Sequence, residues 1–201
     1  MASDVAEASY YSQRAGYCPL PASVDRVHRP FMNAALPRAR EFVLQLATQS
    51  RTVMLGTAAP DGEPAAAVAA AVVDAHGAFV IQVSGLAAHA RHLSANPRAS
   101  VLLAEDEAVA AHPLARRRLT FSCRVEAVRS GSEEHRALLA ALRARFGEVV
   151  DVMAGLPDFR LLRLVPERGR LVLGFGEAYT VEAAGWHRAD ALQLAPVRPA
   201  G

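Results

Sequence analysis

The chain has 201 residues, of which 52% are hydrophobic, and a formal net charge of +2. This length allows one well-buried core and argues against two full domains, and so small a charge, with basic and acidic residues interspersed, argues against nucleic-acid binding. Arg, Asp or His interrupts every apolar run before it reaches membrane-spanning length, and the absence of lysine excludes Schiff-base capture of pyridoxal phosphate.

The first predicted helix follows an irregular segment. Residues 1–33 mix Tyr, Ser, Pro and charged residues without periodicity, which predicts an N-terminal arm. In residues 37–50, Phe42, Val43 and Leu46 fall on one stripe, as in an amphipathic helix with proline near its start. The folded domain is therefore expected to begin here.

A β-hairpin is predicted next. Residues 51–59 are β-rich, and residues 60–64 (PDGEP) form a turn with Asp-Gly at its centre. The second arm, residues 65–74, is almost entirely alanine and valine, so propensity alone favours a helix. The tight turn before it favours a strand instead. Small side chains there would let a flat molecule approach the sheet, although an alanine-rich core strand explains the same composition.

The rest of the chain alternates strands with short helices. Ser130 and Glu133 stand at capping-box spacing before a helix that ends at Gly147. The expected helices are residues 87–95, 130–146 and 148–154, and the expected strands are residues 78–83, 99–103, 119–128, 159–164, 170–173 and 178–182. The chain after Gly185 has no regular pattern.

This order of elements predicts the fold class. Six or more antiparallel strands with helices between them are typical of an α+β fold, here a small antiparallel barrel with peripheral helices. We expect residues 34–183 to form this domain, with the N-terminal arm at residues 1–33 and a C-terminal tail at residues 184–201.

The two cysteines bear on the cellular compartment. Cys18 and Cys123 lie far apart without C-x-x-C spacing, and the first residues lack the pattern of a secretory signal. A reduced, cytoplasmic setting fits this usage. Cys123 sits inside a predicted strand, where packing is the expected role.

Anion-binding side chains gather in residues 82–121. Hydroxyl, imidazole and guanidinium groups recur there in an otherwise apolar span, which is how a protein holds a planar, acidic cofactor. Residues 116–118 are all arginine, and because alternate side chains of a strand point to opposite faces, only part of this triplet can address one ligand. The cofactor-binding candidates are Ser84, His89, Arg91, Arg118 and Thr120.

Five motifs resemble those of a known family. They are S-x-L-A-x-H-A-R-x-L-x-x-N-P-x-x-S (residues 84–100), A-R-R-R-L-T-F (115–121), R-F-G-E-V-V-D (145–151), D-F-R-L-L-R-L (158–164) and G-F-G-E-A-Y (174–179). In order and spacing they resemble the HugZ/HutZ haem-utilisation family, part of the FMN-binding split-barrel group typified by pyridoxamine 5'-phosphate oxidase. The resemblance covers roughly residues 36–181.

The resemblance implies a fold, an assembly and a cofactor. It implies an FMN-binding split barrel that forms a homodimer, with a pocket lined by both chains for a small planar cofactor, either haem or FMN. In the haem-degrading members, a C-terminal histidine binds the iron, and a carboxylate from the partner chain orients that histidine. By this resemblance Asp158 is the orienting, catalytic carboxylate, while His89 and Arg118 occupy pocket positions.

The iron-binding histidine does not carry over. Pro196 falls near its expected position, and proline cannot bind iron. Three weak alternatives are His187, Cys18 and His28.

Three functions follow. The first is a haem-binding protein that opens the ring with O2. The second is an FMN-dependent oxidoreductase, and the third is a non-catalytic carrier of haem or flavin.

Overall fold

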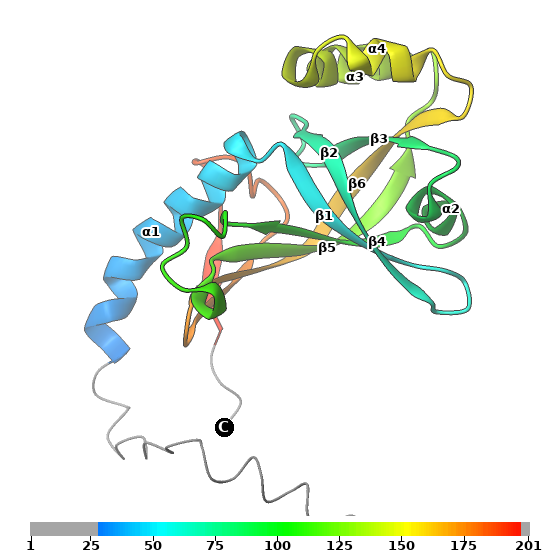
Figure 1. The fold of residues 1–201 in the computed structure, drawn as a ribbon. Coiled ribbons are helices and arrows are strands. Elements are labelled where there is room, and N and C mark those ends of the chain that lie inside the picture. Colours follow the sequence, from blue (N-terminus) through cyan, green and yellow to red (C-terminus); the bar gives the residue numbers. More distant parts are fainter. Residues whose placement is uncertain (1–27, 198–201) are drawn as a thin grey trace, which may run out of the picture. The chain divides into compact units, whose positions relative to one another are not determined.

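The computed structural model describes residues 28–197, with side chains from residue 35 onward. The helices are α1 (His28–Gln49), α2 (Ala88–Ala95), α3 (Glu133–Phe146) and α4 (Val149–Ala154), and a 3-10 turn spans Pro113–Ala115. The strands are β1 (Thr52–Ala58), β2 (Pro64–Val73), β3 (Phe79–Ser84), β4 (Arg98–Ala104), β5 (Arg118–Ala127), β6 (Phe159–Gly174), β7 (Glu177–Val181) and β8 (Leu194–Pro196) (Figure 1). The barrel belongs to one compact unit that begins at Leu36.

Hydrogen bonds between strands close the sheet into a barrel. Within the described residues, eight antiparallel strands follow the order β3-β2-β1-β4-β5-β6-β7-β8, and β3 also pairs with β6. β6 makes the closure, because its first half pairs with β3 and its second half with β7. The predicted α+β antiparallel barrel with peripheral helices is confirmed, and the alanine-rich second hairpin arm is indeed a strand, β2.

β6 is one strand of 16 residues, where the sequence pattern predicted two. Ser122 on β5 pairs with Arg168, while the next residue, Cys123, pairs with Pro166, so Glu167 is an extra residue on β6. Proline has no N–H to donate, and a β-bulge is one of the few places where a strand tolerates it. Pro166 therefore marks a bulge within one strand, and the prediction of a gap between two strands was wrong.

Two helix starts also differ from the prediction. α1 begins at His28 and runs through Pro37, because one missing N–H does not end a helix that has turns on both sides. The cap of α3 is Ser132, whose hydroxyl accepts a hydrogen bond from the His135 amide at 3.0 Å, and not Ser130. Among the described helices, none combines the length and the apolar character needed to cross a bilayer.

Alternation along the strands separates an inner from an outer face. On β5, Leu119, Phe121 and Cys123 are buried, while Thr120 and Ser122 between them face outward. The inner side chains join those of α1 and the other strands in one apolar core. Burial raises the pKa of the Cys123 thiol to about 12, which fits the packing role expected for it.

The C-terminal segment completes this core. Trp186 is fully buried, its ring centroid lies 5.2 Å from that of Phe79 and 4.9 Å from that of Phe121, and its indole N–H donates to the Gly77 carbonyl at 2.7 Å. Gly77 has φ +87°, and a Cβ there would lie 3.0 Å from Trp186 Nε1. The segment expected to be irregular is therefore packed, and it ends in β8, which pairs with β7.

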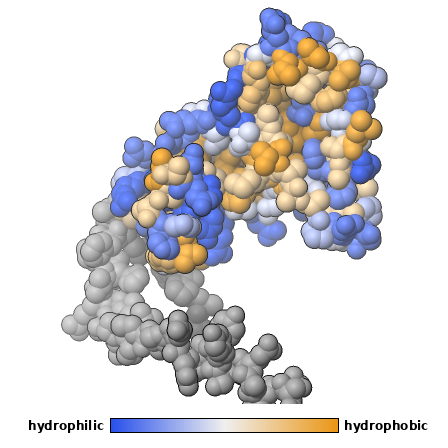
Figure 2. Space-filling view, in the orientation of Figure 1, coloured by the Kyte–Doolittle hydropathy of each residue, from blue (hydrophilic) through white to orange (hydrophobic). Residues whose placement is uncertain are grey.

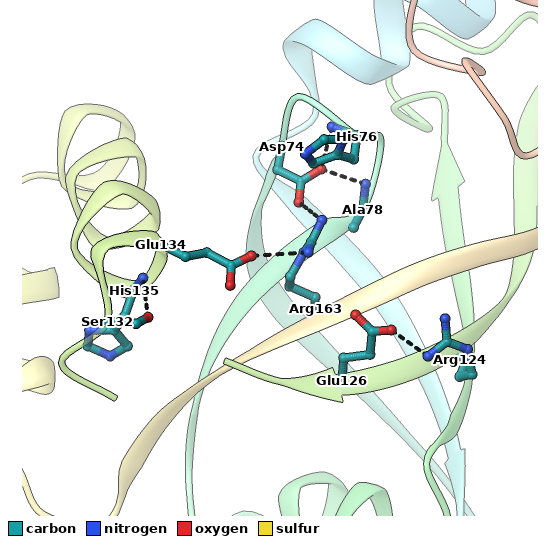
Figure 3. Close-up of polar contacts among 9 residues, drawn as sticks. All are labelled: Asp74, His76, Ala78, Arg124, Glu126, Ser132, Glu134, His135 and Arg163. Carbon is teal, nitrogen blue, oxygen red and sulfur yellow. Dashed lines mark hydrogen bonds and ion pairs between the residues drawn. The ribbon is translucent and has the colours of Figure 1, made fainter. Parts of the chain in front are cut away.

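Arg163 on β6 joins the α3 helix to the β2–β3 turn. Its guanidinium lies 2.6 Å from the Asp74 carboxylate and 3.1 Å from that of Glu134 (Figure 3). Asp74 also accepts hydrogen bonds from the amides of His76 and Ala78, at 2.8 and 2.9 Å, so one carboxylate holds both the turn and the arginine. The ion pair with Glu134 therefore anchors α3 over the end of the barrel where β3 and β6 pair.

Trp186→Ala is expected to lower the free energy of unfolding by about 3–5 kcal/mol, because it leaves a large cavity among Phe79, Phe121 and the β2–β3 turn. Urea denaturation followed by far-ultraviolet circular dichroism measures it. Arg188→Ala, two residues away and exposed, is the control and should leave the midpoint unchanged. Equal midpoints for the two variants would contradict the core role of Trp186.

Candidate functional site

Ser84 and Asp158 meet where β3 and β6 begin to pair. Ser84 Oγ donates a hydrogen bond to Asp158 Oδ2 at 2.5 Å, and the Gly85 amide donates to the Asp158 carbonyl at 2.8 Å. Among the described residues, Oδ1 of Asp158 has no hydrogen-bond partner, and the side chain is only half-buried. Asp158 therefore presents one fixed and one free carboxylate oxygen.

The loop from Ser84 to α2 is held by its own hydrogen bonds. Ser84 Oγ accepts from the Leu86 amide at 3.1 Å, and Arg91 Nη1 donates to the Leu86 carbonyl at 2.5 Å. Leu86 itself is 82% exposed. The loop therefore displays an apolar side chain on a fixed backbone, while Arg91 and Ser84 are engaged with the protein.

Two histidines share one face of α2. His89 and His92 are three residues apart, and His92 Nδ1 lies 3.2 Å from the hydroxyl of the buried Thr57. Burial, with a smaller contribution from His92, lowers the pKa of His89 below its usual value. Arg160 on β6 donates to the Ala90 carbonyl at 2.8 Å and so fixes the helix against the barrel. We refer to Ser84, His89, Arg91 and Asp158 as the α2 corner.

The arginine triplet before β5 divides between two roles. Arg116 and Arg117 form ion pairs with Glu107 and Glu105, and the Arg117 guanidinium also lies 4.3 Å from the Phe42 ring centroid. The hydrogen bond from Arg117 lowers the pKa of Glu105. Arg118 bonds only to the Arg116 carbonyl, at 3.0 Å, and has no carboxylate partner among the described residues.

Arg118 belongs to an outer arginine group, defined as Arg118, Arg168 and Arg170. On the outer face of β5 and β6, Thr120 pairs with Arg170, and Ser122 pairs with Arg168. No described carboxylate lies within ion-pair distance of these three guanidinium groups. Guanidinium groups next to hydroxyls form a site for carboxylate or phosphate.

The outer side chains of β5 and β6 continue, in register, into an apolar row on the neighbouring strands. Val68, Met54 and Leu102 lie side by side in register across β2, β1 and β4, and Leu102 pairs with Thr120 of β5. Val68 is 69% exposed, and the three residues line a shallow apolar cavity of about 580 Å³. Figure 2 shows apolar side chains gathered over the barrel strands on this side. An apolar surface with an arginine border matches a flat, acidic molecule.

A single chain does not bring the α2 corner and the outer arginine group together. The α2 corner adjoins the start of β6, and the outer arginine group lies in its second half, so at about 3.3 Å per residue the separation along the strand approaches ~35 Å. Figure 1 shows β6 crossing the barrel from the α4 end to the β6–β7 hairpin. The residues predicted to share a pocket are therefore split between two ends of the barrel.

Of the three weak iron ligands, only His187 has a side chain among the described residues. His187 is used at the β2–β3 turn, where its Nε2 lies 3.2 Å from the Ala75 carbonyl. Cys18 and the side chain of His28 lie outside the described residues. Residues 35–197 contain no group of three His, Cys, Asp or Glu side chains that could hold a metal ion.

Sequence reasoning missed Arg168 and Arg170. The alternation R-G-R places both on one strand face, but the pattern predicted a gap at residues 165–169 with a new strand from Arg170, so the two side chains were not assigned to a common face. The apolar row of Val68, Met54 and Leu102 was missed because the alternation does not show which face of a strand is covered.

Comparisons with known proteins agree with this fold. The profile of the pyridoxamine 5'-phosphate oxidase family matches residues 37–173. The haem oxygenase HutZ of Vibrio cholerae is 39% identical over 145 residues, 72% of this chain and 80% of that protein. The chloroplastic non-canonical haem oxygenase HOZ of Arabidopsis thaliana is 30% identical over 69% of this chain, which spans 40% of that protein. A crystal structure of Vibrio cholerae HutZ, described there as a haem storage protein, superposes with a TM-score of 0.62 at 34% identity, over 67% of this chain and 93% of that one.

His92→Gln is expected to raise the pKa of His89 toward 6.5, because it removes the nearby positive charge while burial remains. In the wild type the lowered pKa means that protonation of His89 penalises the folded state, so its contribution to stability is full above pH 6.5 and is lost as the pH falls through the folded value. An NMR titration of the histidine ring signals measures both proteins. A wild-type His89 pKa at or above 6.5 would contradict this reading.

Proposed function

We propose that this chain, which belongs to the pyridoxamine 5'-phosphate oxidase family and to its HutZ/HugZ haem-utilisation group, binds haem at the interface of a homodimer. The observation that carries the proposal is the outer arginine group beside an exposed apolar row. A cytoplasmic location remains the expectation, and the buried free thiol of Cys123 is compatible with it.

The anionic edge of haem fits the outer arginine group. Haem has two carboxylates at one edge of an otherwise apolar ring. Arg118 on β5 and Arg170 on β6 lie next to Thr120 on the outer face of the sheet, without a carboxylate partner among the described residues. A guanidinium binds a carboxylate through two parallel hydrogen bonds, and the Thr120 hydroxyl adds a donor. The apolar row of Val68, Met54 and Leu102 supplies a flat, dry surface next to them.

A two-fold dimer accounts for the split between the two ends of β6. In an isologous dimer each surface meets its counterpart, so the α2 corner of one protomer can complete a pocket that begins at the outer arginine group of the other. The exposed Val68 and Met54 support this, because an apolar row of this kind is normally covered. The free Oδ1 of Asp158 would then accept a hydrogen bond across the interface.

The described residues fit the porphyrin ring and its carboxylates, but they do not identify the residue that binds the iron. The described residues offer hydrogen-bond donors for the haem carboxylates and an apolar surface for the ring, whereas Nε2 of His187 lies 3.2 Å from the Ala75 carbonyl at the β2–β3 turn. When bound, haem would supply a redox-active iron that reacts with O2. This chain's residues would orient the ring through its carboxylates and exclude water from its faces. Because two relatives are named haem oxygenases, we extend oxygen-dependent haem breakdown to this chain.

Arg170→Gln and Arg118→Gln are each expected to weaken haemin binding about tenfold, because each removes a charge-assisted hydrogen bond to a carboxylate. A haemin titration followed at the Soret band measures the affinity. Arg129→Gln, which removes an exposed arginine from the β5–α3 loop, is the control and should bind as the wild type does. FMN is titrated in parallel. Tight FMN binding without haemin binding would replace haem by the flavin alternative.

Ascorbate and O2 are expected to bleach the Soret band of the haemin-loaded wild type, and the same sample without O2 should keep it. A band that is stable in air would remove the degradation claim and leave haem binding intact.

Val68→Glu is expected to convert the dimer to a monomer, because it places a charge on the most exposed residue of the apolar row that the partner would cover. Light scattering after size-exclusion chromatography measures the mass. Val152→Glu is a matched control, since Val152 on α4 is 68% exposed against 69% for Val68. A monomeric wild type would contradict the proposed dimer. A Val68→Glu variant that remains dimeric would show that the interface does not include the apolar row.

A further inference from the structure

Ser84 is committed to Asp158. A serine hydroxyl has one hydrogen to donate, and that of Ser84 points to Asp158 Oδ2 at 2.5 Å. One lone pair of the same oxygen accepts from the Leu86 amide at 3.1 Å. An anionic ligand needs a donor, so it would find no free hydrogen on Ser84. This differs from the direct cofactor contact expected from the sequence.

We propose that Ser84 is a positioning residue, which acts on haem binding only by fixing the Asp158 carboxylate, whose free Oδ1 accepts a hydrogen bond from the partner protomer at the shared pocket. The proposal rests on the proposed function, because that function supplies the dimer pocket in which Asp158 lies. Without Ser84, nothing among the described residues would hold Oδ2, and the carboxylate would rotate freely about its side-chain bonds. With Ser84 in place, the hydrogen bond fixes Oδ2 of Asp158, and the lone pairs of Oδ1 therefore point in a defined direction.

The backbone on both sides of this pair is also fixed. The Gly85 amide donates to the Asp158 carbonyl at 2.8 Å, and the Ala87 amide donates to the Ser84 carbonyl at 3.1 Å. A Cβ on Gly85 would lie 3.4 Å from the Asp158 carbonyl oxygen, so the two segments are in close contact. Backbone hydrogen bonds therefore hold both partners of the pair in place, which is the arrangement expected of a preorganised site.

The hydrogen bond that carries the proposal links strands that lie far apart in the sequence. Ser84 ends β3, and Asp158 directly precedes β6, whose first residue, Phe159, pairs with Ser84. The β3–β6 pairing that closes the barrel therefore also sets the carboxylate. Arg160, two residues further on, fixes α2 through the Ala90 carbonyl, so one short segment of β6 orients both sides of the α2 corner.

A double-mutant cycle on the full chain distinguishes positioning from direct contact. Haemin affinity is measured for the wild type, Ser84→Ala, Asp158→Asn and the double variant, and urea unfolding is measured for the same four proteins without haemin. Ser84→Thr keeps the hydroxyl and is the rescue variant. Ser130→Ala removes an exposed serine of the β5–α3 loop and is the matched control.

We expect Ser84→Ala and Asp158→Asn each to weaken haemin binding about five- to tenfold, the double variant to be no weaker than Asp158→Asn, and Ser84→Thr to restore most of the affinity. Additive losses would show that Ser84 contacts the ligand itself and would overturn the proposal. An unchanged haemin affinity in Ser84→Ala would also overturn the proposal, whatever the effect of the substitution on the free energy of unfolding. If the wild type binds no haemin, both the proposed function and this inference are wrong. If the losses of affinity in the two single variants add in the double variant, only the inference is wrong.

Discussion

The structure depends on the pairing of β6 with β3, β5 and β7 at once. A strand of 16 residues can serve three neighbours because the bulge at Pro166 changes its direction, so that the first half closes the barrel and the second half extends the sheet. The same length separates Asp158 from Arg170. The closure that stabilises the barrel is therefore also what separates the α2 corner from the outer arginine group within one chain, and the proposed dimer would bridge this separation.

The arginines show how this chain distributes charge. With no lysine available, arginine serves both as a structural ion-pair partner and as a candidate ligand-binding group. Arg163 and Arg117 are held by carboxylates, and they fix α3 and the β4–β5 loop. Arg118 and Arg170 have no such partner among the described residues. Unpaired guanidinium groups beside an apolar row are the feature that the proposed haem site explains best.

The sequence predicted the barrel better than it predicted the site. Strand alternation and the Asp-Gly turn were sufficient for β1 to β5. The Arg116–Arg118 triplet divides for a reason other than the expected strand period, because β5 begins only at Arg118 and the two arginines before it pair with Glu107 and Glu105. The continuity of β6 was missed because a proline normally indicates a loop or a strand end, and a bulge inside a strand is one of the few exceptions. Burial of Trp186 was missed because it depends on Phe79 and Phe121, more than 60 residues earlier in the chain. Individual side chains such as Ser84 were identified, but the partner that each one binds depends on tertiary pairing.

Subunit complementation tests the shared site most directly. Asp158→Asn and the Arg118→Gln/Arg170→Gln double variant would be co-expressed with different affinity tags, and the heterodimer purified through both. If the pocket takes Asp158 from one protomer and the arginines from the other, each heterodimer has one intact and one doubly altered site. It should bind about one haemin with wild-type affinity, against about two for the wild-type dimer. A heterodimer that binds as weakly as the two parent variants would contradict the account.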